Sequence, residues 1–368
     1  MAEKKEMLEE RLTSLQEEYS KTKDNKKTNK HLRLIKAKIA RVRKEIIVAS
    51  KRVHQDGYFV KKTGDATAAL IGFPSTGKSS LINALANTRS KTASYDFTTT
   101  SIIPGTLVFN DSHIQIFDTP GLIEDAHLGA GGGRSVIAAM KVADLLVFVI
   151  DINNLGHYDK LSSELASLNI YVNRKKPQIQ INAQNSGGLH LEINESGLPN
   201  ADVQEILSGF GIHNATVSIR DRVGEDELIA IISGRAYYMR AIMALNKVDT
   251  AHDYANVAAA LSKKYGMEVI PVSATENMNI DALKRAIYQN MGIITVYLKP
   301  RMGEERLMPM VLRRPATVGD AAKKFHTEIV DELKCAYITG PSAKFPNQRV
   351  GAAHALSNGD VITFIKNK

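Results

Sequence analysis

The sequence G-F-P-S-T-G-K-S at residues 72–79 constrains the fold of this chain more than any other feature. It matches the pattern G-x-x-x-x-G-K-S, whose glycines let backbone N–H groups converge on phosphates without interference from Cβ atoms. An apolar run at residues 68–71 precedes the loop, and a helical pattern at residues 79–86 follows it. In this order the positive end of the helix faces the same phosphates, so an α/β fold is predicted.

The side chains of this loop predict a phosphate site with a bound metal ion. Lys78 is expected to bridge the β- and γ-phosphates, and the Ser79 hydroxyl to bind Mg²⁺. Further phosphate contacts are expected from Gly72, Pro74, Ser75, Thr76, Gly77 and Ser80. A chance loop is the alternative, and the strand–helix context argues against it.

Two motifs downstream add groups that can respond to a γ-phosphate. Asp118 begins the sequence D-T-P-G after an expected strand at residues 113–117, and its carboxylate is expected to hold Mg²⁺. The N–H of Gly121 is expected to contact the γ-phosphate. Thr99 lies in the sequence Y-D-F-T-T-T at residues 95–100, and its hydroxyl would complete the metal shell only while that phosphate is present. Lys78, Thr99 and Gly121 are therefore the candidate catalytic groups, against the alternative of an ordinary turn and a polar loop.

The sequence N-K-V-D at residues 246–249 follows another expected strand and resembles the guanine-reading motif of GTPases. A carboxylate at Asp249 can accept two hydrogen bonds from the ring N–H and the exocyclic amine of guanine, a donor pair that adenine lacks. The stem of Lys247 can cover the base, and the N–H of Ala274 would meet the guanine oxygen. Base contacts are thus predicted from Asn246, Lys247, Asp249, Ser273, Ala274 and Thr275.

Residues 1–50 read as two helices joined by a polar turn at residues 23–27. The second helix has a seam of coiled-coil spacing formed by Leu32, Ile35, Ile39, Val42 and Ile46. Basic side chains lie off this seam and can face phosphates: Lys30, Arg33, Lys36, Arg41 and Lys44. Residues 1–62 hold 18 Lys+Arg against 9 Asp+Glu, whereas the rest holds 30 of each. The asymmetry favours a polyanionic partner such as RNA, and a solvated helical face is the alternative.

Strands alternate with helices from residue 66, which predicts a mainly parallel sheet. The expected strands are residues 68–71, 106–109, 113–117, 144–150, 241–245 and 268–272, the second and third forming a hairpin. Between Gly121 and Asn246 lie 124 residues, about twice what two βα units need. The surplus predicts an inserted α+β domain at residues 172–233, with strands at 178–182 and 189–193 and a helix at 201–210.

The chain after residue 292 reads as a further domain. It has expected strands at residues 294–298, 336–338 and 361–365 and a helix at residues 318–324 capped near Thr317. The predicted domains are a basic helical hairpin at 1–62, a nucleotide-binding domain at 63–171 with 234–292, the insertion at 172–233, and the C-terminal domain at 293–368.

The composition argues against several classes of protein. Cys335 is the single cysteine, so a disulfide framework and a cysteine-based metal site are excluded. No apolar run approaches the roughly 18 residues of a membrane helix, and the charged N-terminus is unlike a signal peptide. We therefore expect a cytoplasmic protein without a membrane partner, and nothing in the sequence requires a dimer.

Hydrolysis is expected to be slow without help. In Ras-like enzymes a glutamine after D-x-x-G orients the attacking water, whereas Leu122 stands here. The glycine-rich residues 129–134 read as a mobile second switch, with a plain flexible loop as the alternative. An arginine finger supplied in cis by Arg134 is disfavoured.

These motifs together resemble the Obg-type GTPases of the translation-factor class. The hydrophobic Leu122, residues 129–134, the insertion and the two flanking domains resemble one branch in particular, the developmentally regulated GTP-binding (DRG) proteins. The resemblance implies a P-loop GTPase domain, a helix-turn-helix segment, an insertion similar to a ribosomal-protein fold and a C-terminal β-grasp-like TGS domain. It also implies ribosomes and RNA as partners in translation, reached through the basic helices and the TGS domain, and a small stabilising partner protein.

Two functions remain open from the sequence. The first is a Mg²⁺-dependent GTPase that converts GTP to GDP and phosphate and acts on ribosomes or RNA. The second is a GTP-gated scaffold for ribosome or RNA in which turnover is incidental, which Leu122 favours slightly. Some relatives are stimulated by potassium, but Ser75 stands where related potassium-dependent enzymes have Asn, so K⁺ dependence is also left open.

Overall fold

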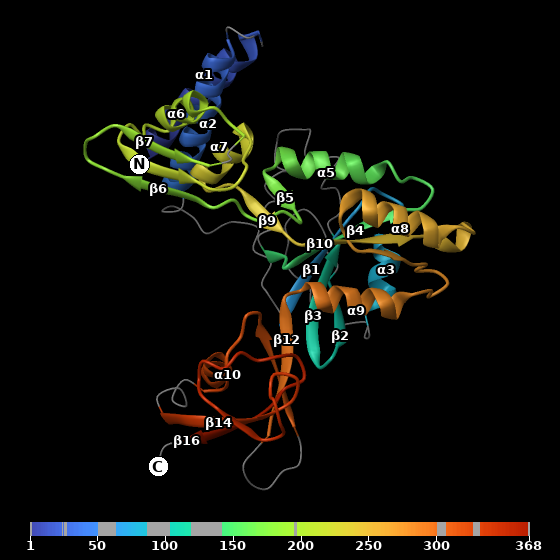
Figure 1. Cartoon of the computed structure of the whole chain (residues 1–368). Helices are drawn as coiled ribbons and strands as arrows, with labels where there is room; N and C mark the ends of the chain where they lie inside the picture. Colours follow the sequence, from blue (N-terminus) through green and yellow to red (C-terminus); the bar gives the residue numbers. More distant parts are fainter. Residues whose placement is uncertain are drawn as a thin grey trace. The chain divides into compact units, whose positions relative to one another are not determined.

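The structure of the chain is a computed structural model that describes residues 2–23, 25, 28–50, 64–86, 104–118, 142–194, 197–299, 307–326 and 332–366. Two units are distinguished, each drawn in Figure 1. The first comprises Met1–Gly57 and Leu165–Tyr238, and the second Tyr58–Glu164 and Met239–Lys368. Helix α5 (His157–Ser167) includes the boundary between them. Among the described helices, none combines the length and the apolar character needed to cross a membrane.

The second unit contains the predicted α/β sheet. Its strands are β1 (Ala66–Ile71), β2 (Pro104–Phe109), β3 (Ser112–Asp118), β4 (Leu145–Asp151), β10 (Ala241–Asn246) and β11 (Val269–Pro271). Their order is β11-β10-β4-β1-β3-β2, and every neighbouring pair is parallel except β2 with β3. The mainly parallel sheet is therefore confirmed. Strands β1, β4 and β10 are buried along their whole lengths, as their continuous apolar sequences require.

Helices and a tight turn complete this sheet. The predicted hairpin is confirmed: β2 and β3 meet at Asn110 and Asp111, whose φ angles of 46° and 55° suit a two-residue turn. The helices are α3 (Lys78–Leu85), η1 (Val248–Thr250), α8 (Tyr254–Tyr265) and α9 (Ile280–Asn290). Apolar side chains of α3 and α9 share one core with the sheet, among them Leu81, Leu85 and Leu283.

The C-terminal part of the second unit forms a separate five-stranded sheet with one helix beside it. The strands are β12 (Ile293–Leu298), β13 (Met308–Arg313), β14 (Leu333–Thr339), β15 (Gln348–Val350) and β16 (Val361–Lys366), in the order β13-β12-β16-β14-β15. The central pair, β12 and β16, is parallel. Helix α10 (Val318–Phe325) begins with a capping box between Thr317 and Asp320, which confirms the cap expected from the sequence.

Strand β13 was missed because its second residue is Pro309. Proline cannot donate a ladder hydrogen bond and is confined to edge strands. The position of β13 at the edge of the sheet, opposite Tyr297 of β12, accommodates it.

The first unit combines the N-terminal hairpin with most of the inserted segment. Helices α1 (Ala2–Lys21) and α2 (Asn29–Ser50) form the hairpin, and β6 (Ile179–Ala183), β8 (Ala215–Ile219) and β7 (Leu189–Ile193) form a sheet in that order. Helices α6 (Asn200–Gly209) and α7 (Glu225–Ser233) pack against α2. Short strands β5 (Ile170–Val172) and β9 (Tyr237–Met239) pair with each other. Two predicted strands and α6 are confirmed within about one residue, whereas β8 and α7 were not predicted.

Close packing and charge hold α2 to the inserted segment. Ala37 of α2 is fully buried, and a Cβ built on Gly209 of α6 would lie 2.5 Å from the Ala37 Cβ, so only glycine permits this approach. Beside it, the Arg33 guanidinium contacts three carboxylates. They belong to Asp202 at 2.7 Å, Glu205 at 3.0 Å and Glu225 at 3.0 Å.

The off-seam basic residues of α2 differ in how much charge they can offer to phosphates, so their role in phosphate binding stays a prediction. The Arg33 side chain is only 13% exposed within its carboxylate cluster. The other four meet acceptors in the same unit: Lys30 pairs with Glu205, Lys36 with Asp226, Arg41 with Glu45, and Lys44 donates to the carbonyl of Ile232. Burial alone would lower the pKa of Arg33, but the hydrogen bond to Glu225 and the charge of Asp202 raise it. Arg33 and Lys36 are thus compensated by carboxylates of the inserted segment, whereas the Lys30 side chain is 77% exposed and the acceptor of Lys44 is a neutral carbonyl.

Replacing Arg33 with alanine should destabilise the first unit, because three carboxylates would be left facing one another. We expect the free energy of unfolding to fall by about 2–3 kcal/mol, less than the ~3–5 kcal/mol of a fully buried pair because the cluster is partly exposed. Arg41→Ala is the matched control, since its pair with Glu45 is exposed on one helix and contributes about 0.5 kcal/mol or less. Urea denaturation followed by circular dichroism measures both, and equal losses in the two variants would contradict this account.

Candidate functional site

Four parallel strands bring the sequence motifs to one edge of the six-stranded sheet. The loop at residues 72–79 follows β1, Asp118 ends β3, Asp151 ends β4 and Asn246 ends β10. Strands β3, β1, β4 and β10 are neighbours in the sheet. Because the carboxyl ends of parallel strands meet at one edge, groups that are far apart in sequence become adjacent there, which is where open α/β sheets bind ligands.

Backbone geometry explains the glycines of the loop. Gly77 has a φ of 91° immediately before α3 begins at Lys78, and a Cβ at this position would collide with the side-chain nitrogen of Asn246. A Cβ on Gly72 would lie 2.5 Å from the carbonyl oxygen of Val149 in β4. Ser75 also has a positive φ, 62°, and is exposed. The loop therefore wraps tightly over the sheet edge, as a phosphate cradle must.

Lys78 lies across the loop that contains it. Its ammonium donates hydrogen bonds to the carbonyl oxygens of Gly72 at 2.9 Å and Phe73 at 3.0 Å. Burial lowers the pKa of Lys78, and the nearby charge of Asp118 partly offsets this effect. Two neutral carbonyl oxygens thus hold the ammonium over the loop. Charged phosphate oxygens are stronger acceptors and would take their place when a nucleotide binds.

Ser79 and Asp118 supply the predicted metal ligands. The Ser79 hydroxyl donates to one carboxylate oxygen of Asp118 at 3.3 Å, so the two oxygens lie close enough to face one ion. Hydroxyl and carboxylate oxygens are the ligands that Mg²⁺ prefers, usually together with waters and substrate phosphates. The donor set therefore fits Mg²⁺.

Asn246 connects the two ends of the site. Its side chain is almost fully buried, its amide nitrogen donates to the carbonyl of Thr76 at 2.8 Å, and its amide oxygen accepts from the N–H of Ala274 at 3.2 Å. One side chain thus joins the phosphate loop, the strand β10 and the loop after β11. Thr76 is itself fixed, since its hydroxyl donates to the carbonyl of Phe73 at 2.9 Å.

Lys247 and Asp249 have different surroundings. Lys247 has a left-handed backbone, with a φ of 64°, and its ammonium pairs with Asp151 at 2.7 Å. Burial alone would raise the pKa of Asp151, but hydrogen bonds from Lys247 and Asn153 lower it. Asp249 lies in η1 and is exposed, so its carboxylate is open to an incoming base.

The last predicted loop is ordered by its own hydroxyl groups. Ser273 is fully buried, its hydroxyl lies 3.1 Å from that of Thr275, and it accepts from the N–H of Glu276 at 3.2 Å. These bonds fix the backbone on either side of Ala274. Pro74 and Ser80 lie on the exposed side of the phosphate loop and α3.

Other predicted site residues lie outside the described part of the chain. They are Thr99, Gly121 and Leu122, together with residues 129–134. Conversely, sequence reasoning missed Asp151. An acidic residue at the end of a fully buried strand was the available signal, because that place lies at the ligand edge of the sheet.

Comparison with known proteins identifies the relatives of this chain. A family model described as "50S ribosome-binding GTPase" matches residues 67–183, its C-terminal region matches residues 186–293, and a TGS domain matches residues 294–366. The chain is 37% identical to a developmentally-regulated GTP-binding protein 2 homolog of Dictyostelium discoideum, over 97% of this chain and 99% of that protein. It is 34% identical to developmentally-regulated GTP-binding protein 1 of Xenopus laevis, over 97% and 98%. An uncharacterized GTP-binding protein of Methanocaldococcus jannaschii is 36% identical over 97% and 93%.

Asn246→Ala should weaken binding of both the phosphates and the base. It leaves the buried carbonyl of Thr76 and the N–H of Ala274 without their partner, at about 1–3 kcal/mol for each group. We expect a lower unfolding midpoint and a rise of at least about tenfold in the Kd for GDP. Asn256→Ala, an exposed asparagine bonded only locally to Asp253, is the control and should change neither quantity. A normal GDP affinity in Asn246→Ala would contradict the role of the bridge.

The Asp151–Lys247 pair should stabilise the folded chain near neutral pH and lose this effect in acid. The pKa of Asp151 in the folded chain lies below its value of about 3.9 in the unfolded chain. The stabilisation by the pair is therefore fully present above the unfolded-state pKa and is lost as the pH falls through the folded-state pKa. The difference in urea midpoint between the wild-type chain and Asp151→Asn should therefore be constant near neutral pH and shrink below about pH 4. If the difference in urea midpoint grew in acid, the pKa of Asp151 would be raised by folding and not lowered.

Proposed function

The chain belongs to the developmentally regulated GTP-binding (DRG) protein family, and from this GTPase membership we propose that it is a Mg²⁺-dependent GTP hydrolase acting on ribosomes in translation. The observation that carries the nucleotide assignment is the Asn246 bridge between the phosphate loop and the guanine motif. This contact between the phosphate loop, the N-K-V-D motif and the loop after β11 supports one nucleotide bound across all three. The description of the matching family model supports ribosomes as the partner.

In the proposed reaction, water attacks the γ-phosphate in line with the leaving GDP oxygen. Lys78 and the loop N–H groups neutralise the charge that develops on the phosphate oxygens. Ser79, Asp118 and Thr99 hold Mg²⁺, which when bound neutralises the charge of the β- and γ-phosphate oxygens. The N–H of Gly121 contacts the γ-phosphate and loses this contact when GTP is hydrolysed. The conformational change on hydrolysis therefore begins at the residues next to Asp118.

Intrinsic turnover should be slow. The residue after D-x-x-G is Leu122, which cannot orient water by hydrogen bonding as the glutamine of Ras-like enzymes does. We propose that the missing group is supplied in trans by the ribosome or by a small stabilising partner protein. A K⁺ ion is the other candidate, although Ser75 lacks the amide of the related potassium-dependent enzymes.

The proposed contacts with ribosomal RNA are the basic N-terminal helices and the TGS domain. Arg33 and Lys36 pair with carboxylates of the inserted segment, which reduces the charge that they offer to RNA. Lys30, Arg41 and Lys44 are exposed, and the acceptor of Lys44 is a neutral carbonyl, so these three are the better candidates for RNA contact. The proposed location is the cytoplasm, where ribosomes are found.

GTP turnover with and without ribosomes tests this function, in sodium and in potassium buffers. We expect turnover well below one per second for the isolated protein and strong stimulation by ribosomes. Lys78→Ala, which removes the phosphate-binding ammonium, should abolish turnover in every mixture. Tight GTP binding with no turnover under any condition would contradict the enzyme assignment and favour the GTP-gated scaffold. Stimulation by potassium alone would contradict the proposed supply in trans.

Asp249→Asn should change base specificity instead of abolishing nucleotide binding. The asparagine amide cannot accept both guanine N–H bonds, but its N–H can donate to the extra carbonyl oxygen of xanthine. We expect the Kd for GDP to rise by about 10²-fold or more and the Kd for xanthosine diphosphate to fall. Competition binding with both nucleotides measures the change, and equal losses for both would show that Asp249 does not read the base.

A further inference from the structure

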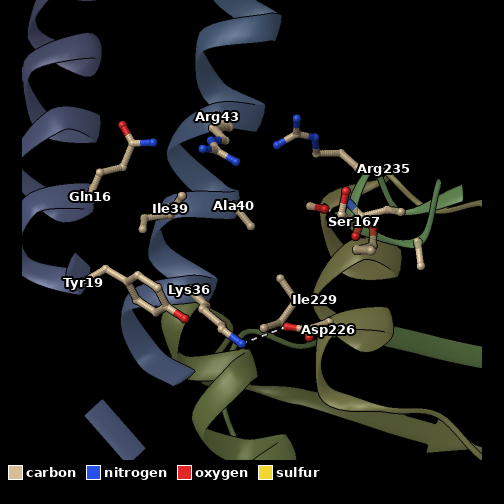
Figure 2. A pocket seen from close by; sticks show the side chains of 14 residues that line it. Gln16, Tyr19, Lys36, Ile39, Ala40, Arg43, Ser167, Asp226, Ile229 and Arg235 are labelled. Carbon is tan, nitrogen blue, oxygen red and sulfur yellow. Dashed lines mark hydrogen bonds and ion pairs between the residues drawn. The ribbon is translucent and has the colours of Figure 1, made fainter. Parts of the chain in front are cut away.

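A cavity of about 530 Å³ lies within the first unit, far in sequence from the nucleotide motifs. Its walls come from α1, α2, α7, the end of α5 and residues just after α5 and α7 (Figure 2). Its size falls in the ~300–1,000 Å³ range of small-molecule sites. All of its lining residues belong to one unit, so the cavity is formed without the nucleotide-binding sheet.

The charges of this cavity do not balance. Lys36 on one wall pairs with Asp226 at 3.0 Å, which compensates both side chains. Arg43 from α2 and Arg235, just after α7, extend toward one another in Figure 2. Within the described part of the chain, neither guanidinium has a carboxylate within 4 Å or an accepting oxygen at hydrogen-bond distance.

Two guanidinium groups held near each other repel, and partial burial strengthens that repulsion. Burial and the positive charge of Arg43 lower the pKa of Arg235, which is the expected mark of such crowding. The contrast with Arg33 on the same helix is informative, because Arg33 is compensated by three carboxylates of this chain. An anion entering the cavity would supply the compensation that the described residues of the chain do not.

The other walls favour an anion attached to an organic body. The aliphatic side chain of Ile39 lies near Arg43, and the ring of Tyr19 and the side chain of Ile229 add apolar surface near Lys36 and Asp226 (Figure 2). A planar guanidinium forms paired hydrogen bonds with phosphate oxygens, and two of them match the charge of a phosphomonoester, about −1.5 to −2 at neutral pH. We propose that Arg43 and Arg235 form a second anion site, separate from the GTP site, that binds the phosphoryl dianion of a small molecule.

Calorimetric titration tests this site with the full chain kept saturated with GDP and Mg²⁺, so that the phosphate loop is filled. The probes are adenosine 5′-monophosphate, inorganic phosphate and adenosine at constant ionic strength. We expect one further site for the monophosphate and none for adenosine. Arg43→Met and Arg235→Met should each weaken binding about tenfold to a hundredfold. Arg41→Met is the matched control, because Arg41 is exposed on the same helix and does not line the cavity.

Folding of the variants is checked by thermal unfolding without ligand. Removing one of two repelling charges should leave the unfolding midpoint of each methionine variant unchanged or higher. Arg235→Lys keeps the charge but loses the paired hydrogen bonds, so this variant should bind the monophosphate with intermediate affinity. Tighter binding of the monophosphate than of inorganic phosphate identifies a phosphorylated small molecule as the ligand, and equal affinity identifies free phosphate. The proposal is overturned if neither phosphate binds, or if binding persists unchanged in both methionine variants.

Discussion

The buried amide of Asn246 is the contact on which the nucleotide site depends. It donates to the phosphate loop at Thr76, 170 residues away in sequence, and accepts from the loop after β11 at Ala274, 28 residues away. The absence of a side chain at Gly77 leaves room for it. A single buried side chain therefore contacts both the phosphate loop and the loop next to the guanine motif. We propose that this contact couples phosphate binding to base recognition.

A second constraint concerns the charge of the chain. The sequence is basic at its N-terminus and nearly neutral elsewhere, which suggests a polyanion as the partner. In the folded chain the Arg33 guanidinium instead meets three carboxylates of the inserted segment. The charge of Arg33 is thus used at an internal interface, whereas Arg43 and Arg235 of the cavity have no such carboxylate partner among the described residues.

Local patterns predicted most of the helices and strands correctly. The turn at Asn110 and Asp111, the cap at Thr317 and the continuous apolar strands each depend on a few neighbouring residues, so they can be read from short windows. The partners of Arg33 lie 169 to 192 residues away and cannot be read in this way. Strand β13 was hidden by its proline, and the pairing of Asp151 with Lys247, 96 residues away, follows from the strand order and not from a local pattern. Tertiary contacts, which short sequence windows do not contain, account for these misses.

A crystal structure with Mg²⁺ and a hydrolysis-resistant GTP analogue tests the central claim most directly. We expect the carboxylate of Asp249 to accept two hydrogen bonds from guanine and the ammonium of Lys78 to exchange the carbonyls of Gly72 and Phe73 for phosphate oxygens. Asn246 should keep both of its present hydrogen bonds. A base bound away from residues 246–249, or a Lys78 that stays on the loop carbonyls with the phosphates elsewhere, would contradict the account.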